Sequence, residues 1–357
     1  MTDSATFLMA ICQVGAEWAL KEEVARRWPD LHFAFSRPGF VTFKDTSQSL
    51  TTTSPHPLVG SVFARTCSFS IGKVTADEED ANIQRFWKLL NGIPVQHLHV
   101  WQRDHVLPGE RGFTPGPSQS ANELGQRILE ACPRDEKPQL NELAHPGEMI
   151  ADCVLVEPND WWIGLHRAES VPQRWPGGVP KLTPPDEMIS RAYLKTSEAL
   201  VWSRLPVQAN DHFVELGCSP GGSAQALLDR GYLVTGIDPA EVDPRMKDRE
   251  GFTYVRKRSA DLKRKEFRAF RWLMADLNVA PGYTLAVVED IVTRGDVHIA
   301  GMLLTLKLMD NEHYSQIGEF LARVRSWGYE EVRARQLAFN RQEICIAALK
   351  SKSLRRL

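Results

Sequence analysis

The segment between residues 212 and 238 constrains the fold most strongly. His212–Leu216 has the apolar character of a buried strand, and a glycine-rich turn follows it. A helical pattern over Gly222–Arg230 then leads to a second apolar strand, Tyr232–Ile237, which ends at Asp238. Strand, turn, helix and strand within about thirty residues form the βαβ unit of a doubly wound α/β sheet. We therefore predict a doubly wound, Rossmann-like sheet in the C-terminal half.

The same alternation of elements continues on both sides of this unit. A helix is expected over Ser190–Leu200, just before the first strand. Further strands are expected at 272–275, 301–306 and 344–349. A stretch rich in Pro and Gly, residues 175–185, precedes the helix and indicates a domain boundary. We expect the C-terminal domain to cover residues 185–357.

The N-terminal half is expected to hold two small α+β units. The 357 residues suffice for two or three domains, and the acidic run at 77–80 divides the half into units over 1–75 and 76–180. A loop broken by Pro and Gly interrupts the second unit at 107–120. Strands are expected over 7–12, 32–35, 40–43, 97–101, 151–156 and 161–165, and helices over 16–28, 82–90 and 121–131.

Composition excludes several classes of protein. With 43% hydrophobic and 25% charged residues the chain has the make-up of a globular protein, and no stretch approaches the ~20 apolar residues of a membrane span. The N-terminus lacks the pattern of a signal peptide. The six cysteines are scattered without a CxxC pair, which favours reduced thiols in a cytoplasm over a zinc site. His97, His99 and His105 are expected to pack rather than to bind a metal.

The turn after the first strand reads ELGCSPGG, from Glu215 to Gly222. Its glycines let the backbone approach a ligand closely, and the following helix presents free N–H groups. Asp238, at the tip of the second strand, can accept hydrogen bonds from both hydroxyls of a ribose. The turn is neither GxGxxG nor GxxxxGK[ST], so we predict a pocket for S-adenosylmethionine, with Glu215 near its amino-acid end. A tight turn with another ligand, or none, is the alternative.

Four charged residues stand at or near the ends of successive elements in the C-terminal half. The first, Lys195, closes the sequence SRAYLK, which starts at Ser190, and the others are Asp276, Lys307 and Glu343. This set resembles the Lys–Asp–Lys–Glu tetrad of the FtsJ-like (RrmJ-type) ribose 2′-O-methyltransferases. The resemblance implies an enzyme that transfers a methyl group from S-adenosylmethionine to a ribose hydroxyl of RNA.

The resemblance also implies a set of cofactor-binding residues. They are Ser190, Glu215, Gly217, Cys218, Ser219, Pro220, Gly221, Gly222, Ser223, Asp238, Asp261 and Asp276. Asp261 matches the family's acidic residue near the adenine. The family loop usually reads DLGxxPGGW, and here Glu215 replaces the Asp and Ser223 replaces the Trp. The second change alters how the methionine end of the cofactor is packed.

Within this family the chain is most similar to a bacterial group that methylates a cytidine ribose of 23S rRNA. The WPGG sequence at 175–178 resembles the inter-domain stretch of that group, and the resemblance covers residues 174–357. It implies a ferredoxin-like unit over 1–75, a THUMP-like RNA-binding unit over 76–180, and RNA, most closely 23S rRNA, as the partner. The oligomeric state and the target nucleotide stay open.

Methyl transfer from a sulfonium to a hydroxyl is an in-line displacement that requires a positioned hydroxyl and a route for its proton. We expect Lys307 to act as general base or oxyanion stabiliser, and Asp276 to orient it. Lys195 and Glu343 are expected to set the charge of Lys307 and to bind the ribose. Because like charges disfavour each other, one of the two lysines should have a lowered pKa.

Basic residues crowd between Arg245 and Arg271 and in the tail from Lys350 to Leu357. Such clusters suit phosphate backbones, although they are also typical of solvated faces. A formal net charge of −2 neither indicates nor excludes an RNA partner. The alternatives are an inactive RNA-binding assembly factor of the same fold, and a methyltransferase of this fold that acts on another RNA, a protein or a small molecule.

Overall fold

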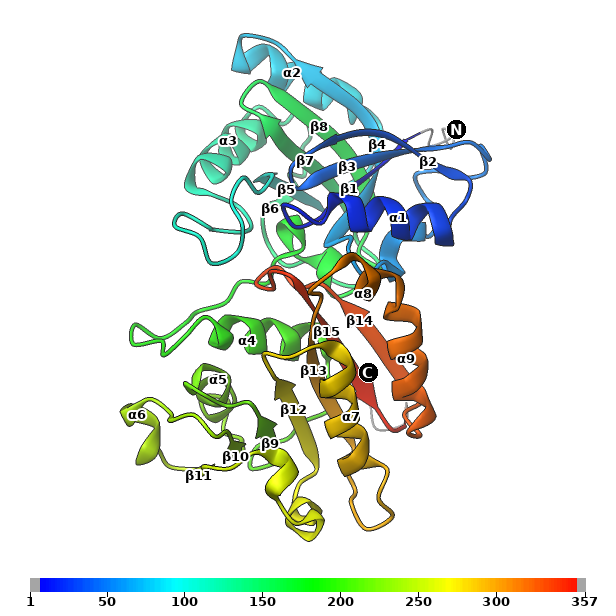
Figure 1. The fold of residues 1–357 in the computed structure, drawn as a ribbon. Helices are drawn as coiled ribbons and strands as arrows, with labels where there is room; N and C mark the ends of the chain where they lie inside the picture. The colour runs from blue at the N-terminus through cyan, green and yellow to red at the C-terminus, as the bar shows by residue number, and fades with distance from the viewer. Residues whose placement is uncertain (1–6, 352–357) are drawn as a thin grey trace. The chain divides into compact units, whose positions relative to one another are not determined.

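The computed structural model describes residues 7–351, which fall into two compact units (Figure 1). The first unit ends at Lys181 and the second begins at Leu182. Within the described residues, none of the helices combines the length and the apolar character needed to cross a membrane. The end of the basic tail, residues 352–357, lies outside the described residues.

The first unit is built on one eight-stranded sheet in the order β2-β3-β1-β4-β8-β7-β5-β6. Neighbouring strands are antiparallel, except that β5 runs parallel to β6 and β7. The strands are β1 (Phe7–Ile11), β2 (Leu31–Arg37), β3 (Phe40–Asp45), β4 (Thr66–Thr75), β5 (His97–Gln102), β6 (Gln139–Leu140), β7 (Met149–Glu157) and β8 (Asp160–Arg167). The helices are α1 (Glu17–Arg27), α2 (Glu79–Leu89) and α3 (Gln119–Glu130). Strand β4 pairs with both β1 and β8, so the two regions expected as separate units contribute to one continuous sheet.

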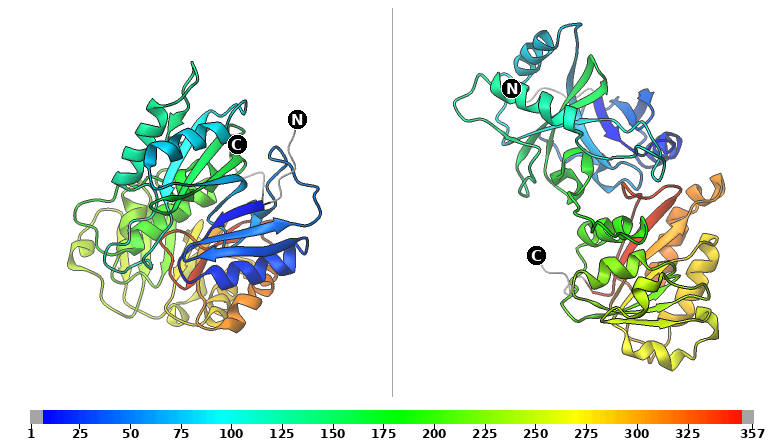
Figure 2. Two further views of the ribbon diagram at one scale, coloured as in Figure 1. Left: turned by 90° about the horizontal axis from the view of Figure 1, so that it is seen from above. Right: turned by 90° about the vertical axis from the view of Figure 1, so that its left-hand side faces the viewer.

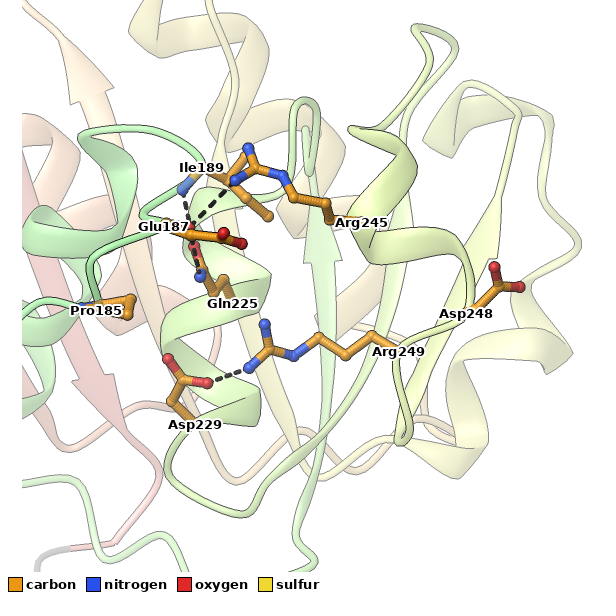
Figure 3. Close-up of a pocket in the computed structure, with 8 residues that line it drawn as sticks. All are labelled: Pro185, Glu187, Ile189, Gln225, Asp229, Arg245, Asp248 and Arg249. Atoms are coloured by element: carbon orange, nitrogen blue, oxygen red, sulfur yellow. Dashed lines mark hydrogen bonds and ion pairs between the residues drawn. The ribbon is translucent and has the colours of Figure 1, made fainter.

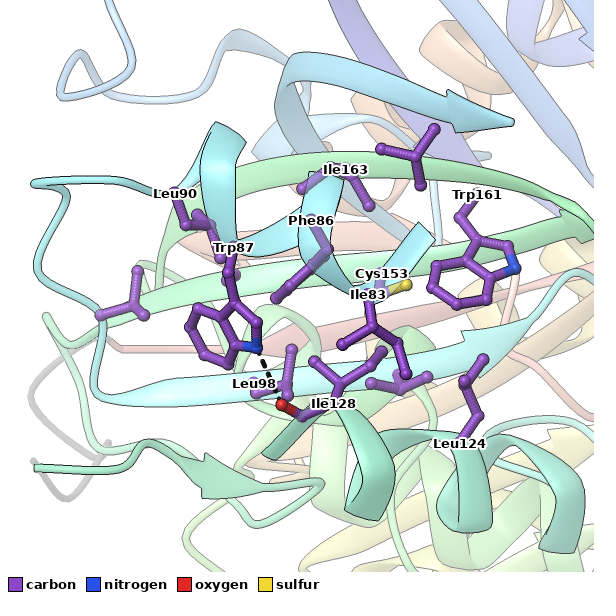
Figure 4. Close-up of a cluster of buried hydrophobic side chains, with 14 of the residues drawn as sticks. Ile83, Phe86, Trp87, Leu90, Leu98, Leu124, Ile128, Cys153, Trp161 and Ile163 are labelled. Carbon is purple, nitrogen blue, oxygen red and sulfur yellow. Dashed lines mark hydrogen bonds between the residues drawn. The ribbon is translucent and has the colours of Figure 1, made fainter. Parts of the chain in front are cut away.

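The core of the first unit lies where α2 and α3 pack on the sheet (Figure 4). Phe86 and Trp87 of α2 lie beside Leu124 and Ile128 of α3. Both pairs pack in one cluster with buried side chains of β5, β7 and β8. The indole of Trp87 also donates a hydrogen bond to the carbonyl of Ile128, at 2.8 Å. Buried apolar residues at i, i+3 and i+4 on both helices explain why these segments form amphipathic helices.

The second unit contains a seven-stranded sheet in the order β11-β10-β9-β12-β13-β15-β14. Its strands are β9 (His212–Leu216), β10 (Leu233–Ile237), β11 (Phe252–Val255), β12 (Trp272–Asp276), β13 (Gly301–Lys307), β14 (Glu331–Arg335) and β15 (Glu343–Leu349). All are parallel except β15, which is antiparallel to both of its neighbours. The predicted Rossmann-like α/β sheet is therefore confirmed.

Helices cover both faces of this sheet. They are α4 (Ala192–Ser203), α5 (Gly222–Leu228), α6 (Pro244–Lys247), α7 (Pro281–Val292), α8 (Asn311–Ser315) and α9 (Ile317–Ser326). Figures 1 and 2 show α4 and α5 on one face and α7 and α9 on the other. The central strands are buried on both sides, which explains their nearly continuous runs of apolar residues.

The strand order reverses between β9 and β12. From β9 the chain proceeds outward to β10 and β11, and it then returns to β12 and β13 on the other side of β9. Ligands of open α/β sheets bind outside the carboxyl ends of the strands at such a switch point. The glycine-rich turn follows β9, and Asp276 ends β12, so both predicted parts of the site lie at this edge.

Candidate active site

Four elements bring the predicted tetrad together. Lys195 lies in the first turn of α4, Asp276 ends β12, Lys307 ends β13 and Glu343 begins β15. Because β15 is antiparallel to β13, the pairing of Lys307 with Glu343 places the start of β15 at the edge where β12 and β13 end. The antiparallel strand thus adds its carboxylate to a site that parallel strands supply with the other charges.

The four side chains form one ion-pair network. Lys307 Nζ lies 3.1 Å from Asp276 Oδ1 and also contacts Glu343 Oε2. Lys195 Nζ contacts Glu343 Oε1 and lies 3.7 Å from Asp276 Oδ2. Each lysine therefore faces both carboxylates, and each carboxylate faces both lysines. The structure brings together all four residues that the sequence singled out.

The network is largely buried and balanced in charge. Burial lowers the pKa of Lys307, but the carboxylates of Asp276 and Glu343 outweigh this effect and raise it above its ordinary value. Burial raises the pKa of Glu343, and the two ammonium groups outweigh this effect and lower it. The expectation that the second lysine would lower the pKa is thus wrong for Lys307, because two nearby carboxylates contact the ammonium directly. In this arrangement Lys307 carries its proton at neutral pH.

The glycine-rich turn packs too closely to admit side chains at its glycines. Gly217 has φ +81°, and a Cβ there would lie 2.7 Å from the carbonyl oxygen of Asp276. Gly221 has φ +122°, and a Cβ there would lie 2.6 Å from Met246 Cγ. A Cβ on Gly222 would collide with the hydroxyl of Ser190. Gly217 and Gly221 require glycine for both the backbone angle and the space, and Gly222 requires it for the space alone.

Glu215 and Ser190 present polar atoms that the protein leaves unsatisfied. Glu215 is 1% exposed, and its Oε2 has no hydrogen-bond partner among the described residues. Burial, followed by the charges of Asp276 and Asp238, raises the pKa of Glu215 well above its usual range, while a hydrogen bond from Ser223 opposes the rise. The buried hydroxyl of Ser190 likewise lacks a partner in the part of the chain that the structure describes. Buried polar groups without a protein partner, next to the glycine-rich turn, can be satisfied by a polar ligand.

Asp238 keeps capacity for a ligand although both of its oxygens are engaged. Oδ2 accepts the N–H of Ser219 at 3.1 Å, and Oδ1 accepts the N–H of Ala240 at 2.8 Å. A carboxylate oxygen has two lone pairs, so each can also accept a ribose hydroxyl. Asp261 is exposed in a short 3-10 helix, and it takes no part in the hydrogen bonds of Asp238.

Two further residues of the turn act through their backbone. Cys218 is 2% exposed, and its Sγ packs where a Cβ of Gly236 would lie, so its thiol belongs to the core. Burial raises the pKa of this thiol, which keeps it protonated. The carbonyl of Pro220 accepts the N–H of Asp243 at 2.8 Å. Any contact of Cys218 with a ligand is therefore limited to main-chain atoms.

A pocket of about 440 Å³ lies beside α5 and α6, and it contains none of the predicted residues (Figure 3). Arg249 pairs with Asp229, while Arg245 and Gln225 both donate to the carbonyl of Glu187, each at 3.3 Å. Gln225 also accepts the N–H of Ile189 at 2.9 Å. Because these polar groups bind one another, the pocket wall fixes the segment that leads into Ser190.

The basic segment after β10 is less positive than its sequence indicates. Four of its arginines form ion pairs within the unit: Arg245 with Asp243, Arg249 with Asp229, Arg256 with Glu241, and Arg268 with Asp296. Lys257 and Arg258 are exposed, and no ion pair joins them to another described residue. Part of the charge available to a phosphate backbone therefore lies at these two neighbouring positions.

Sequence reasoning missed Asn340, which reaches the network from the loop between β14 and β15. This side chain is 1% exposed, and its Nδ2 donates to Glu343 Oε1 at 3.3 Å. The sequence offered one signal, the position of Asn340 three residues before Glu343. This signal is weak, because asparagine is common in turns for local reasons.

The second unit is similar to a known family of methyltransferases. Residues 188–313 match the family model of FtsJ-like methyltransferases. The segment from Ser190 to Lys307, with the glycine-rich turn and the first three tetrad residues, lies inside this match, while Glu343 lies beyond it.

Among full-length relatives the chain is similar to ribosomal RNA large subunit methyltransferase M. The protein of Pseudomonas entomophila strain L48 is 26% identical over 249 residues, a match that covers 62% of this chain and 66% of the relative. That of Pseudomonas fluorescens strain SBW25 is 29% identical and is covered to 65%. The resemblance inferred from the sequence is thereby confirmed. A solved structure, TrmN from Thermus thermophilus, aligns over 96% of this chain and 99% of its own with 14% identity and a TM-score of 0.33.

Proposed function

We propose that this protein is an S-adenosylmethionine-dependent RNA ribose 2′-O-methyltransferase that acts on a cytidine of 23S rRNA. The observation that carries the proposal is the closed network of Lys195, Asp276, Lys307 and Glu343 at the strand edge that also holds the glycine-rich turn. Two lysines and two carboxylates in mutual contact suit the activation of a ribose hydroxyl. The similarity to large-subunit methyltransferases supports rRNA as the substrate.

The residues around the turn fit S-adenosylmethionine. Glu215 Oε2 and the Ser190 hydroxyl are buried polar atoms beside the turn that lack a partner among the described residues. Asp238 would accept the ribose hydroxyls, and Glu215 would bind the amino-acid end. Ser219, Pro220, Ser223 and the main chain of Cys218 would complete the pocket, with Asp261 near the adenine. When bound, this cofactor supplies a methyl group already activated by its sulfonium.

The protein's own groups position the hydroxyl and stabilise the charge that develops on its oxygen. A protonated Lys307 donates a hydrogen bond to the 2′-oxygen as its negative charge develops, which favours the oxyanion-stabilising role over the role of general base. Asp276 lies 3.1 Å from Lys307 and orients its ammonium. Lys195 and Glu343 keep the network balanced in charge and bind the target ribose. In balance, the methyl group of the bound cofactor would form one C–O bond as its C–S bond breaks to leave a neutral thioether, and the hydroxyl proton would pass to water.

The first unit would bind the RNA. We propose that residues 1–75 form its ferredoxin-like part and residues 76–180 its THUMP-like part, joined by the continuous sheet through β4. The six free thiols support a cytoplasmic location. The protein acts without a metal in this proposal, and its oligomeric state is not part of it.

One observation favours an inactive RNA-binding assembly factor instead. Ser223 stands where the family usually has Trp, and in the structure it is buried and hydrogen-bonded to Glu215. If this change abolishes cofactor binding, the fold would retain RNA binding without turnover.

A methylation assay on large-subunit rRNA tests the proposal. The rRNA comes from a strain that lacks this gene, the donor is radiolabelled S-adenosylmethionine, and modified sites are mapped by 2′-O-methyl-sensitive primer extension. We expect label at one ribose with the wild-type protein and with Lys181→Ala, an exposed control, and no label with Lys307→Ala. Cofactor binding without label on rRNA would exclude this substrate. Absence of cofactor binding would favour the assembly factor.

A further inference from the structure

A buried glutamate links the helix that carries Lys195 to the loop before Glu343. Glu198 lies on α4 one turn after Lys195, and its side chain is 3% exposed. Its Oε1 accepts the N–H of Ala338 at 2.8 Å, and its Oε2 accepts the N–H of Phe339 at 3.1 Å. These two hydrogen bonds fix the loop to α4.

The same loop passes this constraint to Glu343 through Asn340. Asn340 Oδ1 accepts the N–H of Leu337 at 2.8 Å, which closes the loop. Its Nδ2 donates to Glu343 Oε1, the oxygen that also contacts Lys195. The two functions of the amide are separable, since Oδ1 closes the loop and Nδ2 binds the carboxylate of Glu343.

We propose that Glu198 and Asn340 are positioning residues that hold the Glu343 carboxylate between Lys195 and Lys307. The inference rests on the proposed function, because it names residues that support the tetrad of that reaction. Glu343 must direct one oxygen to each lysine, and the Asn340 amide adds a neutral donor that holds Oε1 in this orientation beside the two ion pairs. Asn340 fixes the rotation, and Glu198 fixes Asn340 relative to α4.

The first unit contains a matched control for Glu198. Glu23 of α1 is also 3% exposed and accepts the N–H groups of Val62 and Phe63, at 2.9 and 3.3 Å. It thus fixes a loop to a helix in the same way, but in a unit that holds none of the tetrad. Glu23→Gln therefore measures how the loss of such hydrogen bonds lowers stability, in a unit where the tetrad is not affected.

The test measures the reactivity of the tetrad lysines directly. Trace acetic anhydride labels the full-length protein at pH 8–10, and mass spectrometry compares Lys195 and Lys307 with exposed Lys181. The variants are Glu198→Gln and Asn340→Ser. Serine keeps an acceptor for the Leu337 N–H but is too short to reach Glu343, so the loop stays closed while the carboxylate loses its donor.

We expect labelling of Lys195 and Lys307 to rise about threefold or more in both variants, since a misaligned Glu343 no longer contacts their ammonium groups. Glu23→Gln should leave both lysines at the wild-type level, even where its melting temperature falls. Wild-type reactivity in Glu198→Gln and Asn340→Ser, with a lowered melting temperature, would overturn the proposal and leave both residues structural.

Methylation kinetics separate this proposal from the proposed function. We expect kcat of Asn340→Ser to fall about tenfold with the KM for RNA changed less than twofold, because the residue acts on the transition state and not on RNA binding. A wild-type protein that methylates no RNA would contradict the proposed function, whereas the labelling experiment uses neither RNA nor cofactor. An unchanged kcat in Asn340→Ser would overturn the positioning role even if the wild type is active.

Discussion

Lys307 Nζ lies 3.1 Å from Asp276 Oδ1 and also contacts Glu343, so its ammonium is held between two carboxylates. The lysine therefore retains its proton at neutral pH, and in the proposed reaction it would contribute charge. The same contacts link the protonation of the site to the stability of the second unit.

Replacing Glu343 should make this linkage visible. The pKa of Glu343 is lowered in the folded protein, so its ionisation stabilises the fold above its unfolded pKa of ~4.3, and this contribution is lost as the pH falls through the lowered value. Glu343→Gln should therefore be less stable than the wild type at pH 7, with a difference that shrinks as the pH falls below about 4. Urea unfolding between pH 3 and 8 measures this, and a difference that does not change with pH would contradict the assignment.

Replacing Glu215 should have the opposite sign. Its pKa is raised well above the usual range, so its ionised form opposes folding at pH 7. Without ligand, Glu215→Gln should be more stable than the wild type by about 1 kcal/mol at pH 7.5, or roughly 2–4 °C, and the gain should disappear below pH ~4. Its affinity for S-adenosylmethionine should fall at least tenfold. Differential scanning calorimetry and titration calorimetry measure the two effects.

The matched control for that pair of measurements is Glu250→Gln. This residue is exposed, so its replacement should change neither stability nor affinity. Loss of stability in Glu215→Gln would show that its carboxylate makes a favourable contact within the protein.

The turn should tolerate no side chain at Gly222. A Cβ there would collide with the hydroxyl of Ser190, and it would also lie 3.0 Å from the carbonyl oxygen of that residue. Gly222→Ala should destabilise the second unit by about 1–3 kcal/mol and weaken S-adenosylmethionine binding. Gly318→Ala, in α9, is the control, because a Cβ at Gly318 meets no atom within 4 Å. Thermal unfolding and cofactor titration distinguish the two, and equal effects would exclude the steric argument.

Residue patterns predicted five strands of the second unit closely, because the apolar run that forms each strand lies within a short stretch of sequence. Strand β9 lies where the apolar run predicted it, and β10, β12, β13 and β15 differ from their predicted bounds by one residue at an end. The tetrad could be named in advance because the sequence resembles the FtsJ-like methyltransferases, whose Lys–Asp–Lys–Glu set it matches in order.

The features that sequence could not supply depend on contacts between distant residues. The pKa of Lys307 depends on the distances to two carboxylates, and these follow from the register of β13 against β15. The contact of Asn340 with Glu343 is made from a loop that Glu198, which lies far away in sequence, fixes to α4. Strand β4 joins two regions that seemed separate because its pairing partners, β1 and β8, are also distant in the chain.

Lys257 and Arg258, two neighbouring exposed basic residues, should contact RNA in the segment after β10. Lys257 and Arg258 form no ion pair with another described residue, whereas Arg249 pairs with Asp229. A residue that neutralises a phosphate releases a counterion, so its loss lowers the slope of log K against log salt by about one. We expect this reduction for Lys257→Ala and Arg258→Ala, and none for Arg249→Ala. Filter binding of a 23S rRNA fragment between 50 and 300 mM KCl measures the slopes. Equal slopes in all three variants and the wild type would show that this segment does not contact RNA.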